Sequence, residues 1–271
     1  MSLSFLVFLG VPILAPTLGQ LVLFVAPWRW IFGVLALAGS GFMIWALVRL
    51  PETLAPENRL PIRFAWIAEA FRAVVSDRLS VGYTLAMTAI TGALFAFINS
   101  SQQIFFDVFE EPGLFTTVFG LMAAGIAVAS LTNARLVERL GSRRLSHLAL
   151  IGFIASAAVH AGVALSGNES LISFALLQGL TMFCFGFIAG NFGALAMNNM
   201  GRIAGTASSV QGFVSTTFGS LTGFVIGQSF DGTAAPMTIG ITTCGVLALV
   251  AVLIAERGTL FSTVETESRP A

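Results

Sequence analysis

The chain has 271 residues, of which 56% are hydrophobic and 10% charged, and its mean hydropathy is +0.91. A soluble domain typically carries about 25% charged residues, and part of any globule must face water, so this much apolar surface cannot be hidden inside one. The composition excludes a soluble enzyme, a nucleic-acid-binding protein and a disordered chain. It predicts a polytopic membrane protein whose main partner is the lipid bilayer.

The amino-terminal run 3–26 is uncharged and apolar. A cleavable signal would begin with basic residues and carry an apolar core of about 7–15 residues, so this longer run predicts a first spanning helix. Pro12 and Pro16 each remove a helix hydrogen-bond donor and predict a kink. Together with Gly19, these prolines suggest a gating role for the first span, because kinked spans often serve as gates.

Eight runs are long and apolar enough to span a bilayer, for which a helix needs about 20 residues. None of them contains Asp, Glu, Lys or Arg. The predicted fold class is therefore an all-α polytopic membrane protein with eight spans. The predicted spans are 3–26, 30–48, 80–106, 114–134, 147–166, 171–197, 206–230 and 236–255.

The positive charge lies almost wholly on one side of these spans. Twelve of the thirteen arginines fall in the 49–79 and 135–146 loops, the turn at 198–205 and the tail from 256, whereas Arg29 stands alone on the opposite side. Loops rich in Lys and Arg stay in the cytoplasm. Both termini are therefore expected to be cytoplasmic. The opposite side carries Asp107, Glu110, Glu111, Glu169 and Asp231.

The 49–79 loop is the longest polar segment and divides the spans as 2 + 6. Within it, residues 62–75 alternate apolar and charged side chains with helical spacing. This pattern is typical of an amphipathic helix lying at the membrane surface. A cytoplasmic linker is the alternative, and the sequence leaves both open.

The third span carries polar side chains on one helical face. Polar groups inside a bilayer are costly and usually face the bundle interior or a water-filled cavity. The stripe predicts a cavity wall that contacts substrate; the alternative is hydrogen bonding between helices. The stripe consists of Thr84, Thr88, Thr91, Asn99 and Gln102, with Phe95 completing it.

The sixth and seventh spans carry two further patterns. In the sixth, Gln178 and Thr181 lie among aromatic residues that include Phe185, which would suit an apolar, drug-like ligand; ordinary packing is the alternative. In the seventh, Ser208, Gln211, Ser215 and Thr222 form a polar face. A tandem Gly-xxx-Gly that includes Gly219 and Gly223 predicts close packing against a neighbouring helix. We expect this contact to lie at an interface between helices that move relative to each other.

Titratable and nucleophilic groups give no enzyme signature in this sequence. His160 lies near the non-cytoplasmic end of its span, where it could relay protons or sit as a hydrogen-bonded interfacial side chain. Cys184 and Cys244 lie in apolar runs and are interpreted as packing residues. No metal-ligand spacing, phosphate-binding loop or nucleophile motif occurs, so neither a cofactor nor a metal is expected.

Seven strings in chain order resemble the Bcr/CflA drug-resistance subfamily of the major facilitator superfamily. The first, within residues 12–20, resembles the antiporter motif of the fifth helix of such efflux proteins. The strings are PILAPTLGQ (12–20), WRWIF (28–32), LPETL (50–54), FAFINSSQQIF (95–105), NARLVERLGSRR (133–144), AGTASSVQGF (204–213) and DGTAAPM (231–237).

The resemblance implies the fifth to twelfth helices of a twelve-helix exporter. Residues 1–48 would be the last two helices of the amino-terminal bundle, 49–79 the inter-domain loop, 80–257 the six-helix carboxy-terminal bundle and 258–271 a cytoplasmic tail. The arginine-rich stretch with Arg135, Arg139 and Arg143 would correspond to the cytoplasmic loop that locks the outward-closed state of the transporter by charge pairing. Glu138 would occupy the acidic position of that loop. The resemblance also places the protein in the bacterial inner membrane.

The resemblance further implies proton-coupled efflux of drugs or other small amphipathic compounds. The front four helices, where the proton-carrying carboxylate usually lies, are not matched, and we expect a partial chain that works with a separate amino-terminal half. A non-transporting remnant or a helical scaffold is the alternative. The substrate would contact Thr88, Thr91, Phe95, Asn99 and Gln102 on one helix and Gln178, Thr181 and Phe185 on another.

Overall fold

The computed structural model describes residues 18, 19, 21–51 and 64–261. Every regular element within these residues is helical. The elements are α2 (Arg29–Arg49), α3 (Phe64–Ser76), α4 (Arg78–Gln103), the π-helical turn η2 (Ile104–Val108), α5 (Pro112–Leu140), α6 (Ser142–Leu165), α7 (Leu171–Ala196), the 3-10 turn η3 (Gly201–Ile203), α8 (Ala204–Gln228) and α9 (Ala235–Ala255).

Six of the described helices are long and apolar enough to cross a membrane, namely α2, α4 with η2, α5, α6, α7 and α9. The 25-residue helix α8 has sufficient length, and its glycine, serine and threonine residues make it less apolar. These helices match the seven predicted spans from 30–48 to 236–255. The all-α polytopic fold class is confirmed. The predicted span 3–26 lies mostly outside the described residues.

The predicted loop 135–146 is wrong in extent. Helix α5 continues to Leu140 and α6 begins at Ser142, so Gly141 alone separates them. Gly141 has a φ of 77°, a left-handed conformation that glycine adopts without steric cost. Arginine and glutamate form helix readily, so the helix continues beyond its apolar stretch until the glycine ends it.

Side chains and proline fix the starts of several helices. The Asp77 carboxylate accepts a hydrogen bond from the Ser80 backbone N–H at 2.7 Å and caps α4, while Ser170 and Ser173 form a reciprocal capping box at the start of α7. Such caps satisfy backbone donors that have no partner within the helix. Pro112 occupies the first turn of α5, where its missing N–H costs nothing.

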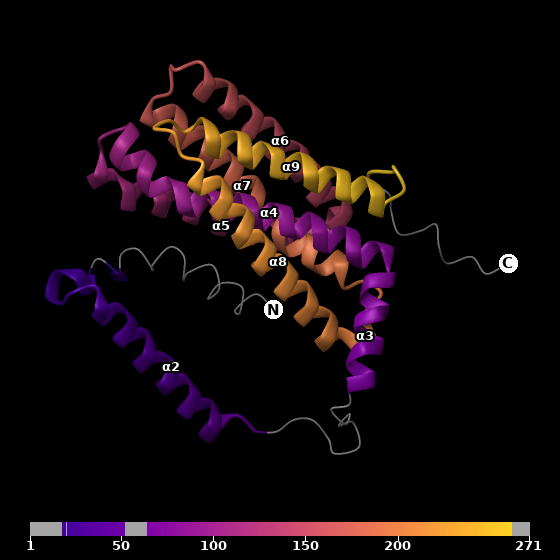
Figure 1. Ribbon diagram of the computed structural model, residues 1–271. Helices are drawn as coiled ribbons and strands as arrows, with labels where there is room; N and C mark the ends of the chain where they lie inside the picture. Colours follow the sequence, from indigo (N-terminus) through magenta and orange to yellow (C-terminus); the bar gives the residue numbers. More distant parts are fainter. Residues whose placement is uncertain (1–17, 20, 52–63, 262–271) are drawn as a thin grey trace.

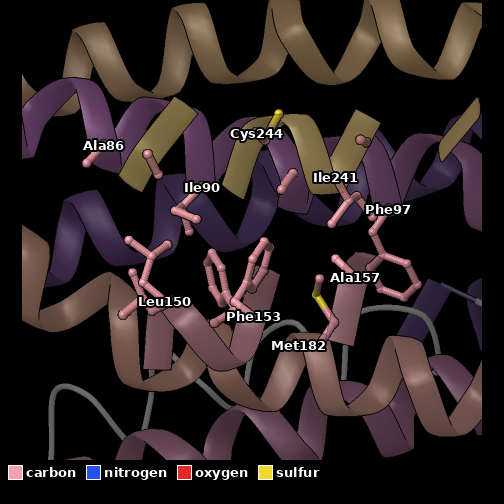
Figure 2. Packing of buried hydrophobic residues seen from close by; sticks show 14 of the residues in the cluster. Ala86, Ile90, Phe97, Leu150, Phe153, Ala157, Met182, Ile241 and Cys244 are labelled. Carbon is pink, nitrogen blue, oxygen red and sulfur yellow. The ribbon is translucent and has the colours of Figure 1, made fainter. Parts of the chain in front are cut away.

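Helices α4 to α9 form one bundle, in which α4 packs against α7, α8 and α9, and α6 packs against α7 and α9 (Figure 1). Buried side chains from α4, α6, α7 and α9 make up the core, with Ile90, Phe153 and Met182 among the largest. Figure 2 shows these side chains interleaved with Leu150 and Ile241. The core therefore lies mainly between α4, α6, α7 and α9.

The two remaining helices differ in how they meet the bundle. No residue of α2 is buried, and Figure 1 shows this helix lying apart from α4 to α9. The helix α3 matches the predicted amphipathic segment 62–75, and its Val74 is buried against Met200 and Ala207. Thus α3 is helical, and its Val74 side chain packs on the bundle near the start of α8.

Candidate functional site

A cavity of about 500 Å³ opens between α4, α5, α7 and α8. Each of these four helices contributes several side chains, and most of the lining is apolar. Small-molecule sites in proteins are typically clefts of about 300–1,000 Å³ with mostly apolar walls and a few polar groups. The cavity has the size and character of such a site.

The walls of the cavity differ in chemistry. Phe97, Phe119 and Phe185 form an aromatic side, in which the first two rings stack with centroids 5.3 Å apart. Helix α8 contributes a polar side, formed by Ser208, Gln211, Ser215 and Thr216, and Thr91 and Ser130 add two hydroxyls from α4 and α5. Among the described residues that line the cavity, none carries a charge.

Ser215 is the polar residue of this wall that is most deeply buried, with 5% of its surface exposed. Its hydroxyl has no hydrogen-bond partner in the structure. A buried hydroxyl without a partner costs free energy, and a ligand that offered a hydrogen-bonding group would satisfy it. The Ser215 hydroxyl is therefore a candidate anchor for a ligand.

The interface between α4 and α8 runs beside the cavity and is built on glycines. Gly219, Gly223 and Gly227 are buried and lie against side chains of α4. The pairs advance by four residues along both helices, so the helices run parallel and meet once per turn. The close approach that the glycine spacing predicts is present. The contacts are Gly219 with Thr91, Gly223 with Phe95, and Gly227 with Asn99.

The predicted stripe on α4 therefore divides between two surroundings. Thr91 both lines the cavity and contacts Gly219 of α8, whereas Phe95 and Asn99 lie against the glycines of α8 and are not among the residues that line the cavity. The Thr88 hydroxyl donates to the Thr84 carbonyl of its own helix at 2.7 Å, which satisfies a hydroxyl within the bilayer without a ligand. Gln102 is exposed.

The predicted residues of α7 also divide. Phe185 lines the cavity. Thr181 is fully buried and its hydroxyl lies 2.9 Å from that of Ser156 on α6, so it faces α6. Gln178 is 1% exposed, and its amide nitrogen has no hydrogen-bond partner. Neither Thr181 nor Gln178 lies among the lining residues.

The other predicted gating and interface residues lie at one end of the bundle, in the amino-terminal segment at Gly19, or outside the described residues. Arg135, Glu138 and Arg139 are exposed near the end of α5, and Arg143 forms an ion pair with Glu256, with 2.8 Å between Nε and Oε1. Pro12 and Pro16 lie outside the described residues. Gly19 is described, and a Cβ added there would meet nothing within 4 Å.

A buried polar cluster at this end was missed by the sequence reasoning. The Tyr83 hydroxyl donates to Glu256 Oε1 at 2.6 Å and lies 2.9 Å from His147 Nε2. The cluster joins α4, α6 and the end of α9, and Arg143 completes it through Glu256. Glu256 had been assigned to the tail and His147 to the edge of a span, and no local pattern links them to Tyr83.

His160 has the hydrogen-bonded arrangement that was one of its two alternatives. Its Nε2 lies 2.6 Å from Glu169 Oε1, and both side chains are buried. The ring also meets Phe174 edge-on, with centroids 5.3 Å apart. His160 therefore ties the end of α6 to the start of α7, away from the cavity.

The cysteines and possible metal ligands show no further site in the described part of the chain. Cys244 is buried and Cys184 half-buried, and both are free thiols within apolar packing. No group of three or more His, Cys, Asp or Glu side chains in the described residues could hold a metal ion.

Comparisons with known proteins match this chain to one protein family and to several relatives. The profile of the Major Facilitator Superfamily matches residues 1–227. The chain is 28% identical over 262 residues to a bicyclomycin resistance protein homolog of Haemophilus influenzae, with 93% of this chain and 63% of that protein covered. It is 25% identical over 256 residues to the multidrug resistance protein MdtL of Escherichia coli O157:H7, with coverages of 92% and 61%.

A third relative is an uncharacterized MFS-type transporter of Bacillus subtilis, YdgK, which is 27% identical over 230 residues. That match covers 83% of this chain and 56% of the relative. The chain therefore spans less than two thirds of the length of each of these relatives. The matches confirm the resemblance that the seven strings indicate.

Proposed function

The chain belongs to the major facilitator superfamily, and on that premise we propose that it forms part of a transporter that exports drugs or other small amphipathic compounds in exchange for protons. Two of its relatives are named for resistance to bicyclomycin or to multiple drugs. We infer that this chain carries its substrate and does not transform it chemically.

The observation that carries the proposal is the cavity between α4, α5, α7 and α8. Its aromatic side and its hydroxyl-lined side suit a compound with one apolar and one hydrogen-bonding face. We propose that Thr91 and Phe185 contact this compound and that Ser215 anchors it. The other predicted contacts stay predictions; they are Thr88, Phe95, Asn99, Gln102, Gln178 and Thr181.

The α4–α8 interface lies within the α4–α9 bundle and beside the cavity. Glycine lets two helix backbones approach closely, so we propose that Gly219 and Gly223 hold α4 and α8 together as one unit while bundles rock against one another in alternating access. The moving interface that the glycine spacing predicts at these residues stays a prediction. We also propose that Pro12, Pro16 and Gly19 form a gate, and that the end of the bundle with Arg135, Glu138, Arg139 and Arg143 locks one state.

The proposed topology places both termini in the cytoplasm and the protein in the bacterial inner membrane. The proposed parts are 1–48, 49–79, 80–257 and 258–271, as the resemblance implies. The distribution of arginine supports this orientation. Single cysteines at Glu110 and Arg139 test it: we expect a membrane-impermeant thiol reagent added outside intact cells to label position 110 alone. Labelling of both from outside would overturn the topology.

We further propose that the chain works with a separate amino-terminal half, which would correspond to the part of the relatives that this chain does not match and would supply the proton-carrying group. In the described residues, the only carboxylates that the structure pairs with buried histidine or tyrosine are Glu169 and Glu256. Both lie outside the cavity, so within the described part of the chain the cavity offers no carboxylate for proton exchange.

Drug accumulation in a pump-deficient bacterium tests the function. The chain would be expressed alone and fused behind the part of the H. influenzae relative that it does not match. We expect the fusion to lower accumulation of an amphipathic fluorescent drug and the chain alone to have little effect. A fusion that reaches the membrane and leaves accumulation at the empty-vector level would contradict the proposal.

A helical scaffold is the second candidate, because α2 has no buried residue and so offers its whole surface to lipid or to another helix. A scaffold needs no ligand in the cavity. Drug binding by the purified chain therefore separates the two candidates: saturable binding favours the exporter, and its absence favours the scaffold.

A further inference from the structure

A short segment after α9 folds back onto the bundle. Residues 257–261 leave the helix with Arg257 at a φ of 54° and Phe261 at 67°. Left-handed backbone is unfavourable for residues other than glycine. At Arg257 it belongs to the cap of α9, where the Gly258 N–H donates to the Leu253 carbonyl at 2.8 Å, whereas at Phe261 contacts with the bundle must hold it. The Phe261 backbone N–H donates to His147 Nδ1 at 3.2 Å, and the Phe261 ring meets the histidine edge-on with centroids 5.9 Å apart.

The hydrogen bonds around His147 define which of its nitrogens carries the proton. Nδ1 accepts from the Phe261 N–H and therefore has no hydrogen of its own. The hydroxyl hydrogen of Tyr83 goes to Glu256, so the Tyr83 oxygen is free to accept from His147 Nε2 at 2.9 Å. The ring is thus neutral, with its hydrogen on Nε2.

Protonation of His147 would break the hydrogen bond that its Nδ1 accepts from the Phe261 N–H. A second proton would go to Nδ1, and two donors would then face each other, N–H of His147 against N–H of Phe261. His147 is 1% exposed, so water cannot easily replace the lost acceptor, and a buried donor without an acceptor costs free energy. The remaining bonds, from Nε2 to Tyr83 and from Tyr83 to Glu256, are compatible with either form of the ring.

The charged groups near His147 are few in the described structure. Arg143 on α6 and Glu256 at the end of α9 have opposite charges and pair with each other. Tyr83 on α4 is the titratable group in direct contact, while α7 contributes the uncharged ring of Phe192 through Tyr83. Arg78 lies further along, at the Ile254 carbonyl. In the described structure, therefore, no unpaired charge beside the His147 ring compensates for the two N–H donors that would face each other at Nδ1.

We propose that His147 is a proton-sensitive latch: in its neutral form it holds residues 257–261 against the bundle, and on protonation it releases them. Histidine ordinarily changes charge between about pH 5 and pH 8, so acidification within this window would undock the segment. Release also relieves the left-handed backbone at Phe261. The proposal does not depend on what the chain transports.

Distance measurements on the full chain test the latch. Nitroxide labels would be placed at Thr259→Cys and Leu165→Cys in a C184A/C244A background; Thr259 is exposed in the segment and Leu165 is exposed at the other end of α6. We expect one narrow distance distribution at pH 8. At pH 5.5 we expect an additional broad component that is absent at pH 8.

Three variants show whether His147 and Phe261 cause the response to pH. His147→Gln keeps an acceptor for Phe261 and a donor for Tyr83 but cannot titrate, so its distribution should stay narrow at both pH values; His160→Gln, at the other buried histidine, should behave like the parent. Phe261→Pro lacks the N–H and cannot adopt a positive φ, so its distribution should be broad at both pH values even if His147→Gln does not fold. A narrow distribution in the parent at pH 5.5 would overturn the latch. So would a pH response that persists in His147→Gln or in Phe261→Pro.

Discussion

Gly223 on α8 lies directly against Phe95 on α4, so closely that a Cβ added to the glycine would overlap the Phe95 Cβ and its backbone. The contact sits at the middle of a run in which three glycines of α8 meet α4 at successive turns. It brings the polar face of α8 beside α4 and so helps to form the cavity. Packing at this one position therefore connects the fold to the proposed site.

Gly223→Leu should destabilise the bundle. Overpacking a tight interface costs about 1–3 kcal/mol, and here the obstructing atoms include backbone, which cannot rotate away. Thermal unfolding of the purified chain in detergent would measure the effect. Gly205→Ala is the matched control on the same helix, since a Cβ there meets nothing within 4 Å. An equal melting temperature for Gly223→Leu and the parent would contradict the packing described.

Ser215→Ala should raise stability and lower ligand affinity. The change removes a buried hydroxyl without a partner, which should stabilise the chain by up to about 1 kcal/mol. Loss of a hydrogen bond to ligand of about 1 kcal/mol corresponds to roughly fivefold weaker binding. Ser220→Ala is the control, because that hydroxyl bonds to the Thr217 carbonyl. Opposite signs for the two measurements at position 215 are the expected signature.

Arg143→Ala should destabilise the chain far more than Arg144→Ala. Arg143 pairs with Glu256, whose side chain is 6% exposed, and removing one partner of a buried pair leaves the other charge desolvated. The expected loss is about 2–4 kcal/mol for Arg143 and close to zero for the exposed neighbour. Chemical denaturation of both variants measures it. Similar stabilities would show that the ion pair contributes little.

Much of the fold could be predicted from the sequence because the bilayer imposes long apolar runs. The runs at 171–197 and 236–255 became α7 and α9 with ends within one residue. The extent of α5 could not be predicted in this way, because Arg135 and Glu138 marked the end of the apolar stretch and the helix continued past them. Apolar length defines where a helix is buried in lipid, and a glycine or a cap defines where it ends.

The cavity could be predicted only in part. Threonine in a spanning helix satisfies its hydroxyl on its own backbone, as Thr88 does on Thr84 and Thr222 does on Phe218. A stripe of threonines therefore does not distinguish a cavity wall from a packed face. On α4, Thr91 lies both at the cavity and against Gly219 of α8, and Asn99 lies only against α8.

The polar cluster at Tyr83 was beyond the reach of sequence patterns. Tyr83 and Glu256 are separated by 173 residues and Tyr83 and His147 by 64. Each looks like an isolated polar residue near a span end. Only the packing of α9 antiparallel to α4, with the start of α6 beside the end of α9, brings the three side chains together.

Thr181→Val tests which neighbour its hydroxyl serves. Because the hydroxyl lies 2.9 Å from that of Ser156 on α6, we expect a loss of about 1 kcal/mol of stability and an unchanged affinity for drug. A double-mutant cycle with Ser156→Ala should show coupling between the two positions. Weaker drug binding without a change in stability would support the direct substrate contact that the sequence predicts.

Drug binding to the purified chain tests the central claim most directly. Thr216 and Thr217 are both exposed neighbours on α8, and Thr216 lines the cavity whereas Thr217 does not. Titration with a neutral, amphipathic fluorescent drug should give saturable binding that Thr216→Trp weakens at least about tenfold by filling the cavity and that Thr217→Trp leaves unchanged. Equal effects of the two tryptophans, or no saturable binding by the parent, would contradict the assignment of this cavity as the substrate site.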